Sequence, residues 1–236
     1  GFFHGIHDGF WKSFDFNVTV NEAISESFPQ EKTAIIRNYP ILEVIRSCKD
    51  KKKNEKLPII VYAGFLNEAR GIKEIINAME YVENRAQLIL LGPWKNEAFQ
   101  DECGQLVGWR YCQYKGKLPL EQAYNVISSS HIGLSILFPH DNYLFSMPTK
   151  ALEYMAFGLP IIMSDFPFWK DTFSGCALFV DPKNPKQIAD AICKLIEDPS
   201  LREKMGAEGK KMVEAKYSWE AESIKLVSIY RKLLGY

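Results

Sequence analysis

Short apolar runs rich in β-branched residues alternate with longer amphipathic segments along most of the chain. Strands are expected at residues 59–63, 87–91, 111–114, 132–137, 160–164 and 177–180. The segment 71–81 places Ile72, Ile75 and Ile76 on one face, as an amphipathic helix does. Strands that alternate with helices are typical of a parallel sheet with crossover connections. The pattern therefore predicts an α/β fold with a Rossmann-like, doubly wound parallel sheet.

Other amphipathic segments predict helices at residues 96–107, 120–128, 149–157, about 168–173, 185–197, 200–216 and 218–234. Ser218 is the expected N-cap of the last helix, with Glu220 and Glu222 in its first turn. Before the regular pattern, two short strands at 17–20 and 33–38 flank a helical stretch. A charged connector then leads to the first strand of the sheet.

Composition excludes several classes of protein. With 236 residues, 47% of them hydrophobic, the chain suits one large globular domain or a domain with a fragment of another. Its apolar runs are far too short to span a membrane, although peripheral contact with one stays open. A net charge of +0 gives no reason to expect a nucleic-acid partner. Five scattered cysteines without a CxxC pair favour a reduced, cytoplasmic compartment.

A metal site is not expected. His4 and His7 share a glycine-rich start with Asp8, and together they offer a conceivable set of ligands. An irregular segment is the favoured interpretation of this stretch. The remaining histidines and cysteines lack the spacing of metal ligands.

Candidate binding residues follow the first two predicted strands. Ligands of open parallel sheets bind at the carboxyl ends of the strands, where loops meet helix N-termini. The first such loop runs from Gly64 to Gly71, and Arg70 within it could grip a phosphate with its planar guanidinium. A plain surface role for Arg70 is equally open. After the second strand, Gly92 provides a backbone turn, and Trp94 either stacks on a base or caps the core.

A loop of about ten residues follows the fourth strand, and loops of that length are often functional. Thr149 is the expected N-cap of the next helix. The three N–H groups that follow, those of Lys150, Ala151 and Leu152, would then be free to bind an anion. Lys150 adds a positive charge, and Glu153 is suited to accept hydrogen bonds from a ribose. The alternative is an exposed i, i−3 pair between Glu153 and Lys150.

The stretch from Thr149 to Ile162, TKALEYMAFGLPII, resembles the donor-binding signature of group 1 glycosyltransferases, the retaining family four with a GT-B fold. The resemblance extends from residue 17 to 236. Further motifs that carry it, in chain order, are Arg70-Gly71, Gly92, Lys115-Gly116, FVDP at 179–182 and YSW at 217–219. Several spaced motifs in order are far more specific than any one of them.

The resemblance implies a hexosyltransferase that transfers a sugar, with retention, from a nucleotide diphosphate sugar to an acceptor, and that needs no cofactor. GT-B enzymes have two Rossmann-like domains with the active site between them. Residues 58–236 then correspond to the nucleotide-sugar-binding domain, 1–40 to a remnant of the N-terminal acceptor domain and 41–57 to a linker. The acceptor, a glycan or lipid-linked glycan, would bind through the missing N-terminal domain. Acceptor-side catalytic residues therefore remain unknown, and the fragment alone is expected to be inactive.

Family members of this kind assemble polysaccharides or surface glycans, which implies a cytoplasmic parent protein at the inner face of a membrane. The chain departs from the family pattern at two positions. The motif Glu-x7-Glu has its second glutamate at Glu153, but its first position is Phe145. A basic position just after the first strand of the sheet is Phe65, whereas Arg70 fills the second basic position. One cation and one anion of the usual site are thus lost together.

We therefore expect Arg70 and Lys150 to hold the diphosphate together. Backbone groups near Ser146 and Met147 would replace the contact between the lost glutamate and the donor sugar. Pro148 offers no N–H to this loop. The resulting set of expected donor-binding residues is Gly64, Arg70, Gly71, Gly92, Ser146, Met147, Thr149, Lys150, Ala151, Leu152 and Glu153.

Two alternatives to a transferase stay open. A nucleotide-sugar epimerase of GT-B fold is one, although the segment from Lys150 to Ala156 fits the transferases better. The other is a module that binds a nucleotide without turning it over, which the loss of the first glutamate at Phe145 favours.

Overall fold

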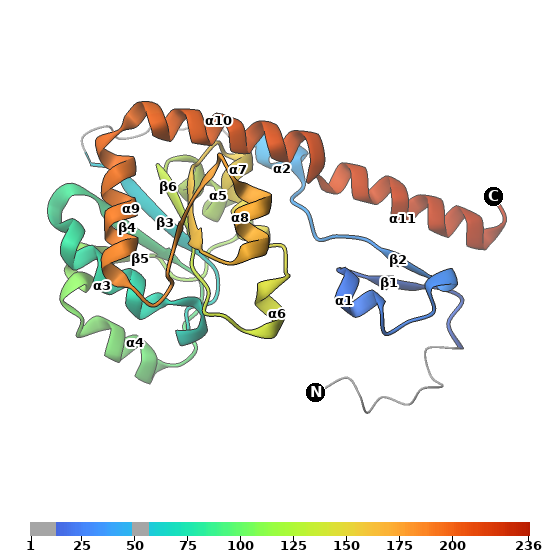
Figure 1. Ribbon diagram of the computed structural model, residues 1–236, viewed down its shortest axis with the longest axis horizontal. Coiled ribbons are helices and arrows are strands. Elements are labelled where there is room, and N and C mark those ends of the chain that lie inside the picture. The colour runs from blue at the N-terminus through green and yellow to red at the C-terminus, as the bar shows by residue number, and fades with distance from the viewer. Residues whose placement is uncertain (1–12, 49–56) are drawn as a thin grey trace. The chain divides into compact units, whose positions relative to one another are not determined.

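Six parallel strands form one sheet in the computed structural model, which describes residues 13–48 and 57–236 (Figure 1). They are β3 (Ile59–Ala63), β4 (Gln87–Leu91), β5 (Cys112–Tyr114), β6 (Ile132–Ser135), β7 (Ile161–Ser164) and β8 (Ala177–Val180). Their order across the sheet is β5-β4-β3-β6-β7-β8. The connections run outward in opposite directions from β3 and β6, so the topological switch point lies between these two strands. This confirms the predicted doubly wound sheet.

Helices lie on the segments between the strands of the sheet and on the segment that follows β8. These are α3 (Ile72–Val82), α4 (Glu97–Gly104), α5 (Leu120–Ser128), α6 (Asp141–Leu144), α7 (Thr149–Ala156), α8 (Pro167–Phe173), α9 (Pro185–Glu197) and α10 (Pro199–Lys216). Three 3₁₀ turns accompany them, η3 (Glu68–Arg70), η4 (Glu83–Arg85) and η5 (Val107–Tyr111). Helices α3 and α9 pack together, and α7 packs against α10. Alternate strand residues such as Ile60, Leu88 and Leu134 join α3 and α9 in one buried core.

The expected elements differ from the observed ones mainly at their ends. Strand β6 stops at Ser135 rather than at residue 137, and α4 stops at Gly104 because η5 takes over the following residues. A larger difference lies in the expected linker 41–57, where Leu42–Ser47 forms helix α2. Leu42 and Ile45 are buried, and α2 packs against α7, so this part of the linker belongs to the sheet domain. The rest of the charged connector, residues 49–56, lies outside the described residues.

The chain divides into two compact units. The larger unit is residues 42–216, and the smaller contains the described residues up to Ile41 together with Tyr217–Tyr236. In the smaller unit, β1 (Asn17–Thr19) and β2 (Thr33–Ile35) pair in parallel, and α1 (Glu22–Ser25) and the 3₁₀ turn η2 (Gln30–Lys32) lie between them. The expected domain 58–236 includes the last helix, α11 (Trp219–Leu234), whereas the contacts of this helix group it with the N-terminal strands.

Helix α11 begins as its sequence predicts. The hydroxyl of Ser218 accepts a hydrogen bond from the N–H of Ala221, with 3.3 Å between Oγ and N. Glu220 and Glu222 lie in the first turn, where a carboxylate interacts favourably with the helix dipole. Among the helices that the structure describes, none combines the length and the apolar character needed to cross a membrane.

Candidate functional site

Two glycines bring bare backbone together at the carboxyl ends of β3 and β4. The N–H of Gly64 donates to the carbonyl of Leu91 with an N···O distance of 2.9 Å. Both glycines have positive φ, 149° at Gly64 and 126° at Gly92. A methyl side chain at Gly92 would lie 1.9 Å from the Gly64 carbonyl oxygen, which is far inside contact distance. Glycine at position 92 therefore allows the two loop backbones to approach each other closely at this edge of the sheet.

The side chains of Lys150 and Arg70, which the sequence analysis assigns to a diphosphate, converge over Gly64. A methyl group built on Gly64 would lie 3.3 Å from Lys150 Nζ and 3.6 Å from Arg70 Nη1. The hydroxyl of Tyr62 would lie 3.5 Å from the same point. Arg70 lies in η3, which follows β3, and Lys150 lies in α7, which follows β6. The two strands that flank the switch point are thus each followed by a segment that supplies one cation.

The Lys150 amine is held by Tyr62. Its Nζ donates to the Tyr62 hydroxyl at 2.9 Å and lies 4.0 Å from the centroid of the same ring. Among the described residues, no carboxylate forms an ion pair with Lys150. Burial lowers the pKa of Lys150 well below its usual value, Arg70 lowers it further, and Glu153 opposes both. A site that concentrates cationic groups without a carboxylate partner is suited to bind an anion.

Arg70 itself has unused hydrogen-bonding capacity. Its side-chain Nε is buried and has no hydrogen-bond partner among the described residues. The backbone around it is fixed instead, because Asn67 Oδ1 accepts from the Arg70 N–H at 3.1 Å. A buried donor without a partner costs stability, so a ligand that supplies an acceptor would be favoured here.

Helix α7 is anchored to β3 by a second tyrosine. The Tyr154 hydroxyl accepts a hydrogen bond from the backbone N–H of Ala63 at 2.8 Å. The ring of Tyr154 can reach β3 only because Gly133 on β6 lacks a side chain; a Cβ there would lie 2.3 Å from Tyr154 Cδ2. Lys150 and Tyr154 are one helical turn apart and therefore share a face. This anchoring fixes the first turn of α7 at the carboxyl end of β3.

Glu153 has a partner that the sequence does not reveal. The hydroxyl of Tyr124 on α5 donates to Glu153 Oε1 at 2.9 Å. Burial raises the pKa of Glu153, while the hydrogen bond from Tyr124 and the charge of Lys150 oppose that rise. The alternative of an exposed i, i−3 pair with Lys150 is wrong, because Glu153 is partly buried and the described residues include no such ion pair.

The start of α7 corrects one expectation. The helix begins at Thr149, and Pro148 rather than Thr149 is its N-cap, without a side-chain capping bond. The Pro148 carbonyl accepts from the N–H groups of Ala151 and Leu152, at 2.9 and 3.3 Å. These two N–H groups are therefore not free to bind an anion as expected. The reason is a helix start one residue earlier, which moves the unpaired N–H groups toward the N-terminus.

The remaining predicted residues fall into different surroundings. Ser146 donates its N–H to the Tyr143 carbonyl at 3.3 Å and accepts from Trp169 Nε1 at 2.9 Å. The backbone N–H of Ser146 is thus engaged within the loop and its carbonyl by α8, which leaves less capacity for the expected contact with a sugar. The expected contact between Met147 and the donor sugar stays a prediction.

Gly71 has a positive φ of 59° at the start of α3, where a Cβ would lie 2.7 Å from a methyl carbon of Ile136.

Trp94 caps the core rather than facing a ligand. Its ring packs at angles against those of Phe99, Trp109 and Tyr114, with centroids 5.9, 6.0 and 5.4 Å away. It also belongs to the apolar shell around the main core. Of the two interpretations that the sequence leaves open, the packing supports the structural one.

With this geometry in view, the chain can be compared with known proteins. The family described as glycosyl transferases group 1 matches residues 45–212. This chain belongs to that family. The resemblance drawn from the sequence motifs is therefore confirmed.

Two curated relatives of this chain have names that refer to the synthesis of surface glycans. The capsular polysaccharide biosynthesis glycosyltransferase CapM of Staphylococcus aureus is 29% identical over 75% of this chain and 46% of its own length. The lipopolysaccharide core biosynthesis glycosyltransferase LpsD of Rhizobium meliloti is 31% identical over 69% of this chain and 46% of its own length. The chain thus spans about half the length of the curated relatives it matches.

A solved structure shares the fold. Anabaena Alr3699/HepE, determined in complex with UDP and glucose, superposes with a TM-score of 0.72 over 92% of this chain and 62% of its own, at 11% sequence identity. This likeness confirms the expected α/β fold of a GT-B glycosyltransferase domain.

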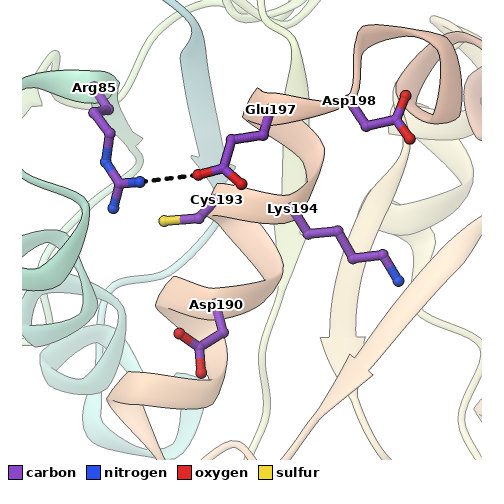
Figure 2. A pocket seen from close by; sticks show the side chains of 6 residues that line it. All are labelled: Arg85, Asp190, Cys193, Lys194, Glu197 and Asp198. Carbon is purple, nitrogen blue, oxygen red and sulfur yellow. Dashed lines mark hydrogen bonds and ion pairs between the residues drawn. The ribbon is translucent and has the colours of Figure 1, made fainter.

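A separate depression on the surface of the chain does not contain the candidate site. Its lining residues are Arg85, Asp190, Cys193, Lys194, Glu197 and Asp198, on η4 and along α9 (Figure 2). Arg85 Nη1 and Glu197 Oε1 form an ion pair of 3.1 Å across it. No predicted donor-binding residue lines this depression, and Arg85, one of its two basic side chains, already has an acidic partner.

A metal centre is likewise absent from the part of the chain that the structure describes. Nowhere within it do three or more His, Cys, Asp or Glu side chains come close enough to hold an ion. His4, His7 and Asp8 lie outside the described residues.

Proposed function

We propose that the chain is the donor-binding half of a retaining hexosyltransferase, which transfers a sugar from a nucleotide diphosphate sugar to a glycan or lipid-linked acceptor. The observation that carries this proposal is the convergence of Lys150 and Arg70 over Gly64, at the switch point of a sheet in a group 1 glycosyltransferase. A diphosphate would receive charge-assisted hydrogen bonds from both side chains. Stabilising a departing diphosphate in this way is the main catalytic task that the donor domain can perform.

Glu153 completes the proposed donor site. Its carboxylate lies one turn along α7 from Lys150 and is held by Tyr124. We assign it to the ribose hydroxyls, with the diphosphate over Gly64 and with Met147 near the sugar. A carboxylate already oriented by one hydrogen bond can accept others through its second oxygen without further ordering. In this site Arg70 and Lys150 supply the positive charge that the diphosphate requires.

The acceptor would bind through a further domain of the longer parent protein, since the matched relatives are about twice as long as the aligned region. The names of these relatives support a role for the parent in polysaccharide or surface-glycan synthesis. We place such a parent in the cytoplasm, where sugar nucleotides are made, with its acceptor at the inner face of the membrane.

A thermal-shift experiment tests donor binding. The chain is melted with millimolar UDP, GDP, ADP or CMP, and so are its Glu153→Ala variant and a control, Glu121→Ala, which removes an exposed carboxylate on α5. One diphosphate is expected to stabilise the wild type by about 2.7 kcal/mol at a hundred times its dissociation constant. That ligand-induced shift should shrink in Glu153→Ala and persist in Glu121→Ala. If no nucleotide shifts the melting curve, donor binding by this chain is refuted.

A second candidate function is a module that binds the nucleotide without turnover. Phe145 favours it, because this side chain stands at the first glutamate of the family motif and is 72% exposed on the loop before α7. The longer parent protein, incubated with the sugar nucleotide whose base this chain binds and then assayed for free nucleotide, separates the two, because this chain alone is expected to be inactive in either case. Release without an acceptor would show that the donor site itself activates the sugar.

A further inference from the structure

Tyr62 has a role that the family motif does not assign. It is the fourth residue of β3 and its side chain is completely buried, yet its hydroxyl reaches the edge of the sheet. There it donates to the Phe65 carbonyl at 3.1 Å and accepts from Lys150 Nζ at 2.9 Å. A tyrosine hydroxyl has one proton, so its use on Phe65 leaves a lone pair directed to Lys150. The bond between Tyr62 and Lys150 therefore has a fixed direction.

The same contact leaves Lys150 able to bind a ligand. A protonated lysine has three N–H donors, and only the one on Tyr62 has a hydrogen-bond partner among the described residues. The face of the Tyr62 ring also attracts the ammonium, whose nitrogen lies 4.0 Å from the ring centroid. The amine is thus held next to the Arg70 guanidinium over Gly64, although the two cations repel each other.

We propose that Tyr62 is a positioning residue of the donor site: its hydroxyl and ring hold the Lys150 amine beside Arg70, where the diphosphate of a nucleotide binds. This inference rests on the proposed function. Without the hydroxyl, the long lysine side chain would lose its fixed partner and could turn away from Arg70. The diphosphate would then have to order Lys150 on binding, at a cost in affinity.

The charges around Lys150 predict proton uptake when the anion binds. Burial and then Arg70 on η3 disfavour the protonated form of Lys150, and Glu153 on the same helix favours it. Arg70 also acts on the hydroxyl of Tyr62, whose pKa burial raises to about 12. Tyr143 on α6 is a further titratable group that faces Tyr62. A bound diphosphate favours the ammonium, so the complex should hold more protons than the free chain. This proton uptake depends on where Lys150 is held.

Isothermal titration calorimetry of the whole chain tests the role of Tyr62. The probes are inorganic pyrophosphate and UDP, titrated into the wild type, Tyr62→Phe, Lys150→Met and the double variant. Each titration is made in two buffers that differ in heat of ionisation. We expect Tyr62→Phe to weaken binding about three- to tenfold and Lys150→Met about tenfold or more, by the worth of charge-assisted hydrogen bonds. The double variant should bind no more weakly than Lys150→Met alone, and Tyr62→Phe should alter the proton uptake.

Tyr154→Phe is the matched control. It removes the other tyrosine hydroxyl that joins α7 to β3, but this hydroxyl accepts from the Ala63 N–H and does not touch Lys150. Any loss of affinity caused by Tyr154→Phe should therefore be the same in the Lys150→Met variant as in the wild type. Tyr62→Phe keeps the buried ring, and circular dichroism checks its fold.

Three results separate the inference from the function on which it rests. If Tyr62→Phe binds pyrophosphate and UDP as the wild type does, or if its effect adds to that of Lys150→Met, Tyr62 does not position Lys150, while the donor site stands. If the wild type binds neither probe, the donor site and the role of Tyr62 are both refuted. Coupling between the two substitutions together with altered proton uptake supports the positioning role.

Discussion

Lys150 and Glu222 are both charged side chains shielded by protein, and their surroundings differ in kind. Glu222 on α11 is 2% exposed and accepts hydrogen bonds from the Arg37 N–H, at 2.9 Å, and from Lys225. The amine of Lys150 contacts the hydroxyl and the ring of Tyr62. Among the described residues, no carboxylate lies within ion-pair distance of it. Breaking a buried charge away from its partners destabilises a fold, whereas a shielded charge without a counter-charge is a candidate site for a ligand.

The largest effect should come from Glu222→Ala, which removes the carboxylate that has all its partners within the protein. The Arg37 N–H would lose its acceptor, and Lys225 would lose its partner. Leaving such a partly buried donor unpaired costs about 1–3 kcal/mol, so hydrogen exchange at the Arg37 amide should accelerate about ten- to a hundredfold. Exchange measured by NMR checks this, with Glu26→Ala on the surface of the same unit as control. Unchanged exchange would mean that the carboxylate does not hold Arg37.

Lys150→Met should show the opposite behaviour. Methionine keeps the apolar stem but removes a charge that has no carboxylate partner, so the ligand-free chain should melt at the same temperature or slightly higher. Affinity for the nucleoside diphosphate that binds should fall about tenfold or more. Lys95→Met, which removes an exposed lysine paired with Glu68, is the control for lost positive charge. A destabilised Lys150→Met variant with normal affinity would make Lys150 a structural residue.

The sheet could be predicted from the sequence because its strands are buried. Residues 59–63, 87–91 and 177–180 form strands with the expected bounds, since short, strongly apolar runs allow few other interpretations. Helix α2 was not predicted because it has six residues and follows a proline, which leaves too few positions to show a period. The N-cap of α7 is predicted one residue too late, at Thr149, because threonine is a good N-cap and proline is not. In the structure the N-cap is nevertheless Pro148.

The charged residues of the site could be predicted, but their supports could not. Arg70, Lys150 and Glu153 stand in recognisable motifs or at helix starts. Tyr62 lies within an apolar strand and has the pattern of a core residue, and 88 positions separate it from Lys150. Tyr124 is likewise 29 positions from Glu153. Contacts of this range depend on how the crossover helices pack on the sheet, and one sequence contains no local signal for them.

Glu222 and Lys150 should also differ in how they make the free energy of unfolding depend on pH. Bonds from Lys225 and Arg37 lower the pKa of Glu222 below 4.5 although burial alone would raise it. The stability that Glu222 provides is therefore present above that pH and is lost as the pH falls through the folded-state pKa. Lys150 has a pKa below 10.5, so its charge disfavours the ligand-free fold at low pH, and this cost disappears as the pH rises toward 10.5.

Chemical denaturation of the wild type, Glu222→Gln and Lys150→Met over a range of pH measures both effects. The difference between the wild type and Glu222→Gln should close on the acid side. Relative to Lys150→Met, the wild type should gain stability on the alkaline side. If the difference from Lys150→Met is independent of pH, the amine does not titrate in the shielded surroundings that the structure gives it.

The smallest effect is expected from Lys225→Met. The Lys225 side chain is 57% exposed, and ion pairs of exposed lysines contribute only about 0.2–1 kcal/mol. Glu222 would keep the bond from the Arg37 N–H, so exchange at that amide should change only a few-fold, measured as for Glu222→Ala. If Lys225→Met instead costs as much as Glu222→Ala, the ion pair rather than the backbone bond satisfies Glu222. Glu222 and Lys150 would then differ only in whether an opposite charge lies next to them. In that case, a carboxylate introduced beside Lys150 should make Lys150 contribute to the stability of the fold.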